Sequence, residues 1–178
     1  MNELKPPFDK FLMFDVESVG LHGEGFSVGW VVMQDGKEIA SAEYSCDPAS
    51  VQGEDDDRAW VDDNVMSWQN CSTIHTVIHH FLDAIQECYK KGFAVVTDCC
   101  YPVETNFLEK CWPYMQALEM QGPYPLYDVA SVLATLGYDA TAMYSRLDGE
   151  LPKHNAVTDA RQSARVLLEA LSGTLEKP

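Results

Sequence analysis

The chain contains 178 residues, a length that suits one hydrophobic core, and we expect a single domain over residues 1–178. Apolar residues make up 46% of the sequence and charged residues 22%, which excludes an intrinsically disordered chain. The formal net charge of −16 argues against the broad basic surface that holds long duplex DNA, but it permits a local site for short single strands or for a metal held by carboxylates.

The sequence carries no signal for a membrane span, for export or for disulfide bonds. No stretch approaches the roughly 18–20 apolar residues of a membrane span, and residues 1–10 lack the apolar run of a secretory signal. The six cysteines form no CxxC pair, and two of them, Cys99 and Cys100, are adjacent. We therefore expect a cytoplasmic protein with reduced thiols and without a zinc site.

Three strands are expected at the start of the chain. Residues 8–16 form an apolar and aromatic run that ends in acids, and residues 26–34 form a second apolar run. Asp35-Gly36 is a turn signal, and residues 38–46 alternate in character. The second and third strands are therefore predicted to form a hairpin that follows the first strand directly.

The segment from Asp47 to Asn70 has no clear hydrophobic period. We expect a long surface excursion there, with one short helix at most. The acidic run Glu54–Asp57 is predicted to be a solvated loop, because like charges repel and remain hydrated. The pattern favours neither an interface nor a substrate lid for this excursion, and both remain open.

The remainder of the chain alternates between helices and strands. Apolar residues three and four positions apart predict an amphipathic helix from Ser72 to Cys88, and the valine-rich residues 93–97 predict a buried parallel strand. Then follow a helix over residues 103–120 interrupted or kinked at Pro113, a short strand at Leu126-Tyr127, a helix from its cap Asp128 to Leu136, a loop over residues 137–153 and a helix from Asn155 to Leu171. The order β-β-β-α-β-α-(β)-α-α predicts an α/β domain, a mixed β-sheet flanked by helices.

Asp15 and Glu17 are two positions apart at the end of the first predicted strand. Residues two apart lie on the same face of a strand, and neighbouring carboxylates repel each other unless a cation lies between them. Hard divalent cations such as Mg²⁺ take oxygen ligands of this kind. The pair is a candidate metal site, and the alternative is a solvated strand end with two ordinary acids.

A second polar group surrounds the start of the last predicted helix. If Asn155 caps that helix, Asp159 lies just over one turn inside it and His154 precedes it. Small residues, which let a helix approach a sheet closely, recur every four positions along it: Ala156, Ala160 and Ala164. Asp159 can then point at the acids of the first strand. The alternative is that His154 is an ordinary loop histidine and that Asp159 only stabilises the helix start by interacting with the helix dipole.

The motifs at the two ends are Asp15-x-Glu17-Ser18-x-Gly20-Leu21 and His154-x-Ala156-x-x-Asp159-Ala160. In this order the chain resembles the DEDDh 3′–5′ exonucleases of the ribonuclease H-like superfamily, from about residue 11 to residue 171. Within that superfamily it looks similar to oligoribonuclease, ribonuclease T and polymerase proofreading subunits. The resemblance implies a ribonuclease H-like fold.

The middle motif differs from the family pattern His-Asn-x-x-Phe-Asp-x-x-Phe-Leu, which follows the fourth strand. This chain has Cys99-Cys100 in place of His-Asn, and alignment on Phe107-Leu108 places Glu104 where the aspartate belongs. Asp98 lies at the very end of the predicted strand, another position from which this fold presents a metal carboxylate. Whether Asp98 or Glu104 completes the set of acids stays open.

The resemblance implies hydrolysis of a phosphodiester at a 3′ end with two divalent cations, Mg²⁺ or Mn²⁺. The implied metal ligands are Asp15, Glu17, Asp98 and Asp159, with Glu104 as a further catalytic acid. His154 is the implied general base, a role that suits a side chain titrating near neutral pH. The implied contacts to the terminal nucleotide are Ser18, Gly20 and Leu21.

Basic and aromatic side chains bear on the expected partner, a short or single-stranded nucleic acid. Arg146 and Lys153 are candidates for phosphate contacts, and surface ion pairs are the alternative. Tyr101 and Trp112 are weak candidates for stacking on a base, since each is more often a core residue. The residues do not distinguish RNA from DNA, and a homodimer is an expectation that rests on the resemblance alone.

Two other classes of protein fit the residues. One is a relative with weakened catalysis that binds a nucleic acid or a protein partner, and the altered middle motif favours it. The other is an α/β domain with purely decorative surface acids. That reading predicts that Asp15, Glu17 and Asp159 lie far apart in the folded chain.

Overall fold

The computed structural model describes residues 7–67 and 69–176. Within these ranges five strands form one mixed sheet in the order β3-β2-β1-β4-β5. The strands are β1 (Lys10–Ser18), β2 (Gly25–Gln34), β3 (Lys37–Ser45), β4 (Ala94–Thr97) and β5 (Leu126–Asp128). β2 pairs antiparallel with both β1 and β3, whereas β4 runs parallel to both β1 and β5. The carboxyl ends of β1 and β4 therefore meet at one edge of the sheet.

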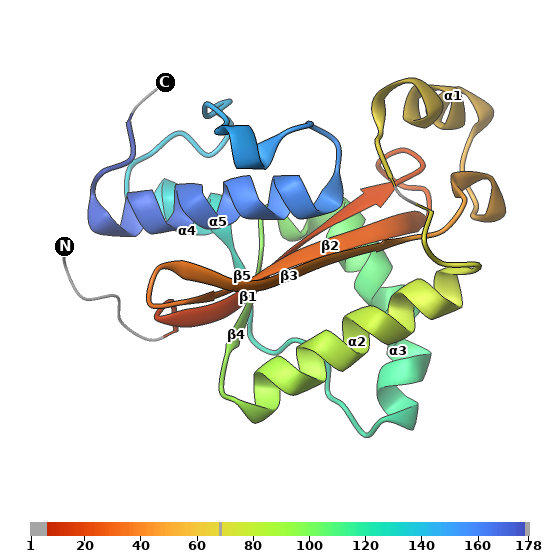
Figure 1. Ribbon diagram of the computed structural model, residues 1–178, viewed down its shortest axis with the longest axis horizontal. Helices are drawn as coiled ribbons and strands as arrows, with labels where there is room; N and C mark the ends of the chain where they lie inside the picture. The colour runs from red at the N-terminus through yellow and green to blue at the C-terminus, as the bar shows by residue number, and fades with distance from the viewer. Residues whose placement is uncertain (1–6, 68, 177–178) are drawn as a thin grey trace.

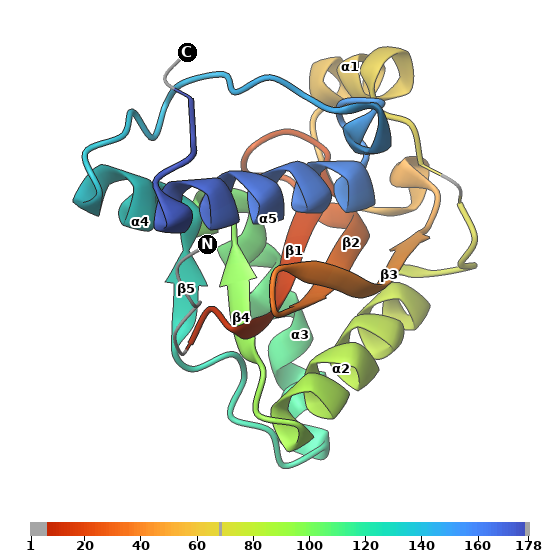
Figure 2. The same cartoon turned by 60° about the vertical axis from the view of Figure 1, so that its left-hand side comes forward.

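Helices cover both faces of the sheet, as Figures 1 and 2 show. They are α1 (Asp55–Asn64), α2 (Ile74–Lys90), α3 (Thr105–Ala117), α4 (Val129–Thr135) and α5 (Ala156–Ser172). α4 and α5 lie on one face and α2 and α3 on the other, while α1 lies beyond one end of the sheet (Figure 1). The predicted α/β class, with a mixed sheet flanked by helices, is confirmed.

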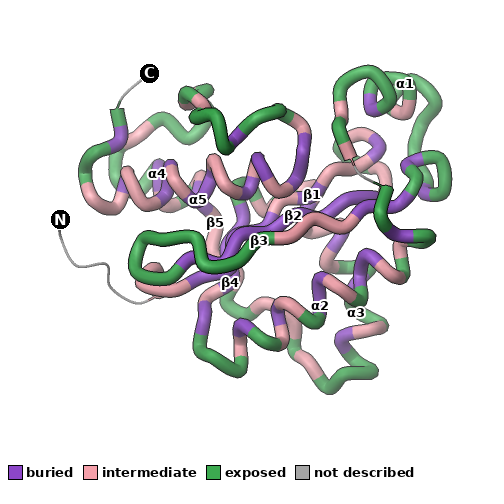
Figure 3. The backbone as a smooth tube through the Cα atoms, viewed as in Figure 1, coloured by how far each residue is buried: buried purple, intermediate pink, exposed green. Residues whose placement is uncertain are grey.

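Each face of the sheet has its own buried core, and β1 contributes to both because its side chains alternate. Leu12 and Phe14 pack with the apolar stripe of α2, including Phe81. Phe11 and Met13 pack on the other face beneath α4 and α5. Figure 3 shows the buried residues concentrated between the layers, with exposed segments in α1 and in the loop before α5.

The last helix begins and ends where the sequence predicts. The Asn155 side chain accepts a hydrogen bond from the Thr158 backbone N–H at 3.2 Å, which caps the first turn. Gly173 ends the helix with a φ of 74°, in the left-handed region that favours glycine. Asp128 caps α4 in the same way through the backbone N–H of Ser131.

The excursion from Asp47 to Asn70 contains one short helix, α1, as the sequence allowed. The acidic run expected as a solvated loop, however, forms the start of that helix, and this prediction is wrong. The first turn of α1 contains Asp55, Asp56 and Asp57, whose negative charges interact favourably with the helix dipole. Val61 anchors the helix in the core. The predicted interruption of α3 at Pro113 is also wrong, because the helix continues through the proline, and Cys111 and Met115 on either side of it stay buried.

The six cysteines are free thiols, and Cys99 is the exposed one among them. Over residues 7–67 and 69–176, no helix combines the length and the apolar character that crossing a bilayer requires.

Candidate functional site

Asp15 and Glu17 lie at the carboxyl end of β1, on the sheet face that α5 covers. They continue the alternation that places Phe11 and Met13 beneath α5. Asp15 pairs in the sheet with Gly29 of β2, and β1 is the central strand, so the acids lie at the carboxyl edge of the sheet with a strand on either side. The alternation along one strand thus explains why both carboxylates face the same helix.

α5 approaches this part of the sheet very closely because position 29 has no side chain. A Cβ atom on Gly29 would lie 2.1 Å from the backbone nitrogen of Val157. Ala156 and Ala160 are fully buried, as the four-residue spacing of alanines predicts. This close contact brings Asp159, in the first turn of α5, over the acids of β1.

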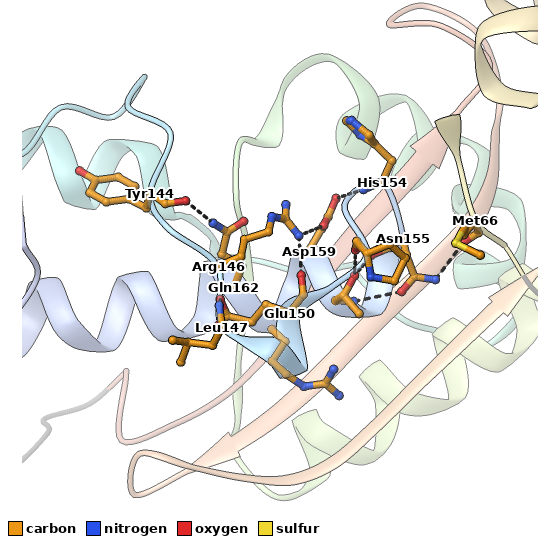
Figure 4. A network of polar contacts seen from close by, with 12 residues as sticks. Met66, Tyr144, Arg146, Leu147, Glu150, His154, Asn155, Asp159 and Gln162 are labelled. Atoms are coloured by element: carbon orange, nitrogen blue, oxygen red, sulfur yellow. Dashed lines mark hydrogen bonds and ion pairs between the residues drawn. The ribbon is translucent and has the colours of Figure 1, made fainter. Parts of the chain in front are cut away.

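Both carboxylate oxygens of Asp159 already have partners within the protein (Figure 4). Oδ1 accepts a hydrogen bond from Nη1 of Arg146 at 2.5 Å, and Oδ2 accepts one from the backbone N–H of His154 at 3.1 Å. Figure 4 shows the two donors reaching Asp159 from opposite sides. Arg146, one of the two candidates for a phosphate contact, is therefore engaged in an ion pair inside the site.

The middle motif supplies two more acids to the same edge of the sheet. Thr97 pairs with Phe14, so Asp98 follows directly beside Asp15. Glu104 is buried in the irregular turn Cys100–Glu104 that leads into α3. Glu104 acts electrostatically on Asp15 and on Glu17, and Asp98 acts on Asp15 and on Glu104.

The crowding of acids changes their protonation. Loss of hydration raises the pKa of Asp15 well above its ordinary value, and the charges of Glu17 and Glu104 add to the rise. Loss of hydration together with the charge of Asp159 raises the pKa of Glu17 to about 8. Burial raises the pKa of Glu104 to about 7. The free protein therefore holds protons on this cluster near neutral pH.

His154 precedes α5 in a fixed backbone conformation. Its φ of 56° lies in the left-handed region, and its carbonyl accepts a hydrogen bond from the backbone N–H of Met66 at 3.2 Å. Its imidazole ring meets the ring of Trp60 edge to face, with centroids 5.1 Å apart. The side chain is half-buried, between the carboxylates and α1.

A pocket of about 410 Å³ opens beside the acids, between the turn after β1 and α1. The predicted nucleotide contacts Ser18, Gly20 and Leu21 all line this pocket. Trp60 and Val103 provide further apolar wall. Leu21 is 66% exposed and Trp60 48% exposed, so both present apolar surface to anything that enters.

The turn that holds these contacts needs a glycine. Gly20 has a φ of 77°, and a Cβ there would lie 2.1 Å from Oδ2 of Asp57 in α1. The Ser18 hydroxyl donates to the carbonyl of Gly20 at 2.7 Å and fixes the turn from within. The excursion after β3 is thus in contact with the predicted nucleotide site.

Sequence reasoning missed two residues of this site. Trp60 lies in the segment without a hydrophobic period, and its only signal was an aromatic residue within an acidic surface stretch. Glu43 of β3 accepts a hydrogen bond from Asn155 Nδ2 at 2.7 Å and contributes to the raised pKa of Glu17. Tyr101 and Trp112, the candidates for base stacking, are both exposed, but they do not line the pocket described above.

Two arginines of α5, near the last motif, form ion pairs with other segments. Arg161 pairs with Glu38 at 2.7 Å, and Arg165 pairs with the buried Glu150 at 2.6 Å. Both hold α5 to neighbouring segments.

The donor set suits a hard divalent cation. One ligand atom from each of Glu17, His154 and Asp159 lies within 4.8 Å of the others, and carboxylate oxygens are the ligands that Mg²⁺ and Mn²⁺ prefer. The protons held on the free cluster are what a divalent cation replaces on binding. The interpretation of the acids as scattered surface decoration is wrong, because Asp15, Glu17 and Asp159 gather on one face of the sheet.

Comparison with known proteins supports the fold. No family model matches the chain, and no curated protein matches it in sequence. A similar solved structure shows 3′-end specific recognition of a histone mRNA stem-loop by a 3′-exonuclease. The match covers 94% of this chain and 66% of that chain, with a TM-score of 0.53 and 14% sequence identity. This chain therefore spans just under two thirds of that protein, and the two share the ribonuclease H-like α/β fold.

Proposed function

We propose that this protein is a metal-dependent 3′–5′ exonuclease of the DEDDh type that acts on short or single-stranded RNA or DNA. The supporting observation is the convergence of Glu17, His154 and Asp159, from opposite ends of the chain, next to the buried Asp15 and beside an open pocket. The similarity of the fold to that of a 3′-exonuclease is in agreement.

Asp15, Glu17 and Asp159 would hold Mg²⁺ or Mn²⁺, and we propose Glu104 rather than Asp98 as the fourth acid. Glu104 acts on both strand acids and is buried next to them. Divalent cations held there would supply positive charge for the attacking and leaving oxygens of an in-line displacement.

His154 would take the proton from the attacking water at an imidazole nitrogen. Hydrogen bonds to Asp159 and Met66 fix the backbone of His154, and this holds the imidazole next to the carboxylates. Histidine is the side chain that most often carries out such a transfer, and the ring can pass the proton on to solvent.

The terminal base would enter the pocket between Leu21 and Trp60. Stacking on an aromatic ring tolerates any base and contributes about 1–3 kcal/mol per base. The walls also include Glu17 and Asp57, and the chain carries a net charge of −16. Because these charges repel a long polyanion, the site suits the end of a short or single-stranded substrate.

The test is release of nucleoside 5′-monophosphates from a short 5′-labelled oligonucleotide, in RNA and in DNA form, with Mn²⁺ or with EDTA. We expect stepwise shortening from the 3′ end with Mn²⁺ only, and none with Asp15→Asn. Absence of products from both substrates with both Mg²⁺ and Mn²⁺ would reject the exonuclease.

A binding module with weakened catalysis is the second candidate. Two observations favour it: Cys99-Cys100 replaces the family's His-Asn, and both oxygens of Asp159 are engaged by protein donors. This candidate predicts that the same oligonucleotides bind without being shortened, so one experiment separates the two.

A further inference from the structure

Arg146 contributes a positive charge at the centre of the carboxylate site. Its Nη1 donates to Oδ1 of Asp159 at 2.5 Å and to the carbonyl of Glu150 at 2.8 Å. The side chains of Arg146 and Asp159 are only 15% and 17% exposed. An ion pair shielded from water to this extent is screened far less than a surface pair.

The loop that carries Arg146 is held against α5 on both sides of it. The buried carboxylate of Glu150 receives two hydrogen bonds from Arg165, at 2.6 and 3.0 Å, and one from the backbone N–H of Leu147 at 2.9 Å. Gln162 donates to the carbonyl of Tyr144 at 2.9 Å (Figure 4). These hydrogen bonds fix the loop on α5 and so hold the guanidinium of Arg146 beside Asp159.

The charge of Arg146 acts on more than one acid. It lowers the pKa of Asp159, Glu17 and Asp98, each of which burial raises. Arg146 thus performs for the free protein part of the neutralisation that a divalent cation would provide.

We propose that Arg146 is a built-in counter-cation that competes with the divalent metal for Asp159. This inference rests on the proposed function, because it requires a metal at these carboxylates. A guanidinium bonded to Oδ1 and a divalent cation at the same carboxylate repel each other. Metal binding therefore weakens or breaks the Arg146–Asp159 pair, and the pair in turn lowers the affinity for metal. The guanidinium and the divalent cation thus compete for the carboxylate of Asp159.

The experiment is a Mn²⁺ titration of the full chain, followed through the electron paramagnetic resonance signal of free Mn²⁺. We compare wild type with Arg146→Gln and Arg146→Met, which remove the charge, and Arg146→Lys, which keeps it. Arg161→Gln is the matched control, because it removes an arginine of α5 whose partner Glu38 lies outside the carboxylate cluster. Thermal unfolding in EDTA confirms that each variant is folded.

We expect the neutral variants to bind Mn²⁺ about tenfold more tightly than wild type, since a neighbouring like charge has been removed. Arg146→Lys and Arg161→Gln should remain within about threefold of wild type. Equal or weaker Mn²⁺ binding by both neutral variants, with wild type binding Mn²⁺, would overturn the competition but not the proposed function. If neither wild type nor the neutral variants bind Mn²⁺, both are rejected.

Discussion

The indole ring of Trp60 and the imidazole ring of His154 meet edge to face, with centroids 5.1 Å apart and ring planes inclined by 77°. Trp60 belongs to α1, and His154 precedes α5. The contact makes α1 part of the candidate active site: it places one aromatic wall of the proposed nucleotide pocket directly against the proposed general base.

Replacing Trp60 should weaken substrate binding and disturb His154 together. Trp60→Ala removes a stacking surface of about 1–3 kcal/mol, so we expect KM to rise about 5- to 150-fold and kcat to fall as well. Trp60→Phe should recover most of both. Steady-state hydrolysis of a short oligonucleotide measures this, and Trp112→Ala is the control because that tryptophan is 47% exposed on α3. Equal effects of the two alanine variants would count against the pocket.

His154→Ala should lower kcat about 10²- to 10⁴-fold, the usual contribution of a general base. Its Mn²⁺ affinity should stay close to that of wild type, because the carboxylates carry most of the negative charge of the site. Asp15→Asn should lose both turnover and metal binding. If His154→Ala instead loses Mn²⁺ binding with its turnover, His154 is a metal ligand and the assignment as base is wrong.

The two acids of the middle motif can be separated by isosteric amides. Glu104→Gln should reduce Mn²⁺ affinity more than Asp98→Asn does, because Glu104 acts on both Asp15 and Glu17. Isothermal titration of the two variants under identical conditions gives the ranking. The reverse ranking would assign the fourth position to Asp98.

The metal-free protein should lose stability as the pH rises. The pKa of Glu17 is about 8 in the folded chain against an ordinary 4.5, so the folded state binds a proton that the unfolded state releases. Between these values unfolding releases the proton, and each such proton gives a slope of about −1.4 kcal/mol per pH unit in the free energy of unfolding. Urea unfolding in EDTA from about pH 5 to pH 8 measures this slope.

Saturating Mn²⁺ should flatten this pH dependence, because the cation replaces the protons on the carboxylates. Glu17→Gln should reduce the slope by about one proton's contribution without metal, because Asp15 and Glu104 still titrate. A stability that rises between about pH 5 and pH 8 in EDTA would contradict the raised pKa values.

Gly29→Ala should push the start of α5 off the sheet. Its Cβ would lie 2.1 Å from the Val157 backbone nitrogen, and overpacking of this kind costs about 1–3 kcal/mol or more. We expect a lower unfolding temperature and weaker Mn²⁺ binding, since Asp159 moves with the helix. Gly149→Ala is the control, because its Cβ would meet its nearest neighbour at 3.9 Å. Wild-type metal affinity in Gly29→Ala would show that the close approach does not position Asp159.

The parts of the structure that follow from local pattern were predictable. The two-residue spacing of Asp15 and Glu17 fixed their shared face, and the alanine spacing in α5 indicated close packing on the sheet. The sequence allowed one short helix after β3 but did not locate α1, because α1 is held by the burial of Val61 and by charges at its first turn rather than by an apolar stripe.

Contacts between segments far apart in the chain could not be predicted from the sequence either. The pairing of Arg146 with Asp159 depends on how the loop before α5 folds back, and the contact of Trp60 with His154 depends on the position of α1. Neither Arg146 nor Trp60 belongs to a motif, so no local pattern in the sequence identifies the residue that each contacts.

The most direct test is anomalous diffraction from crystals soaked with Mn²⁺ and a nucleoside 5′-monophosphate. We predict manganese peaks bounded by Asp15, Glu17 and Asp159, with the base between Leu21 and Trp60. Well-diffracting crystals at saturating Mn²⁺ with no anomalous peak among these carboxylates would contradict it.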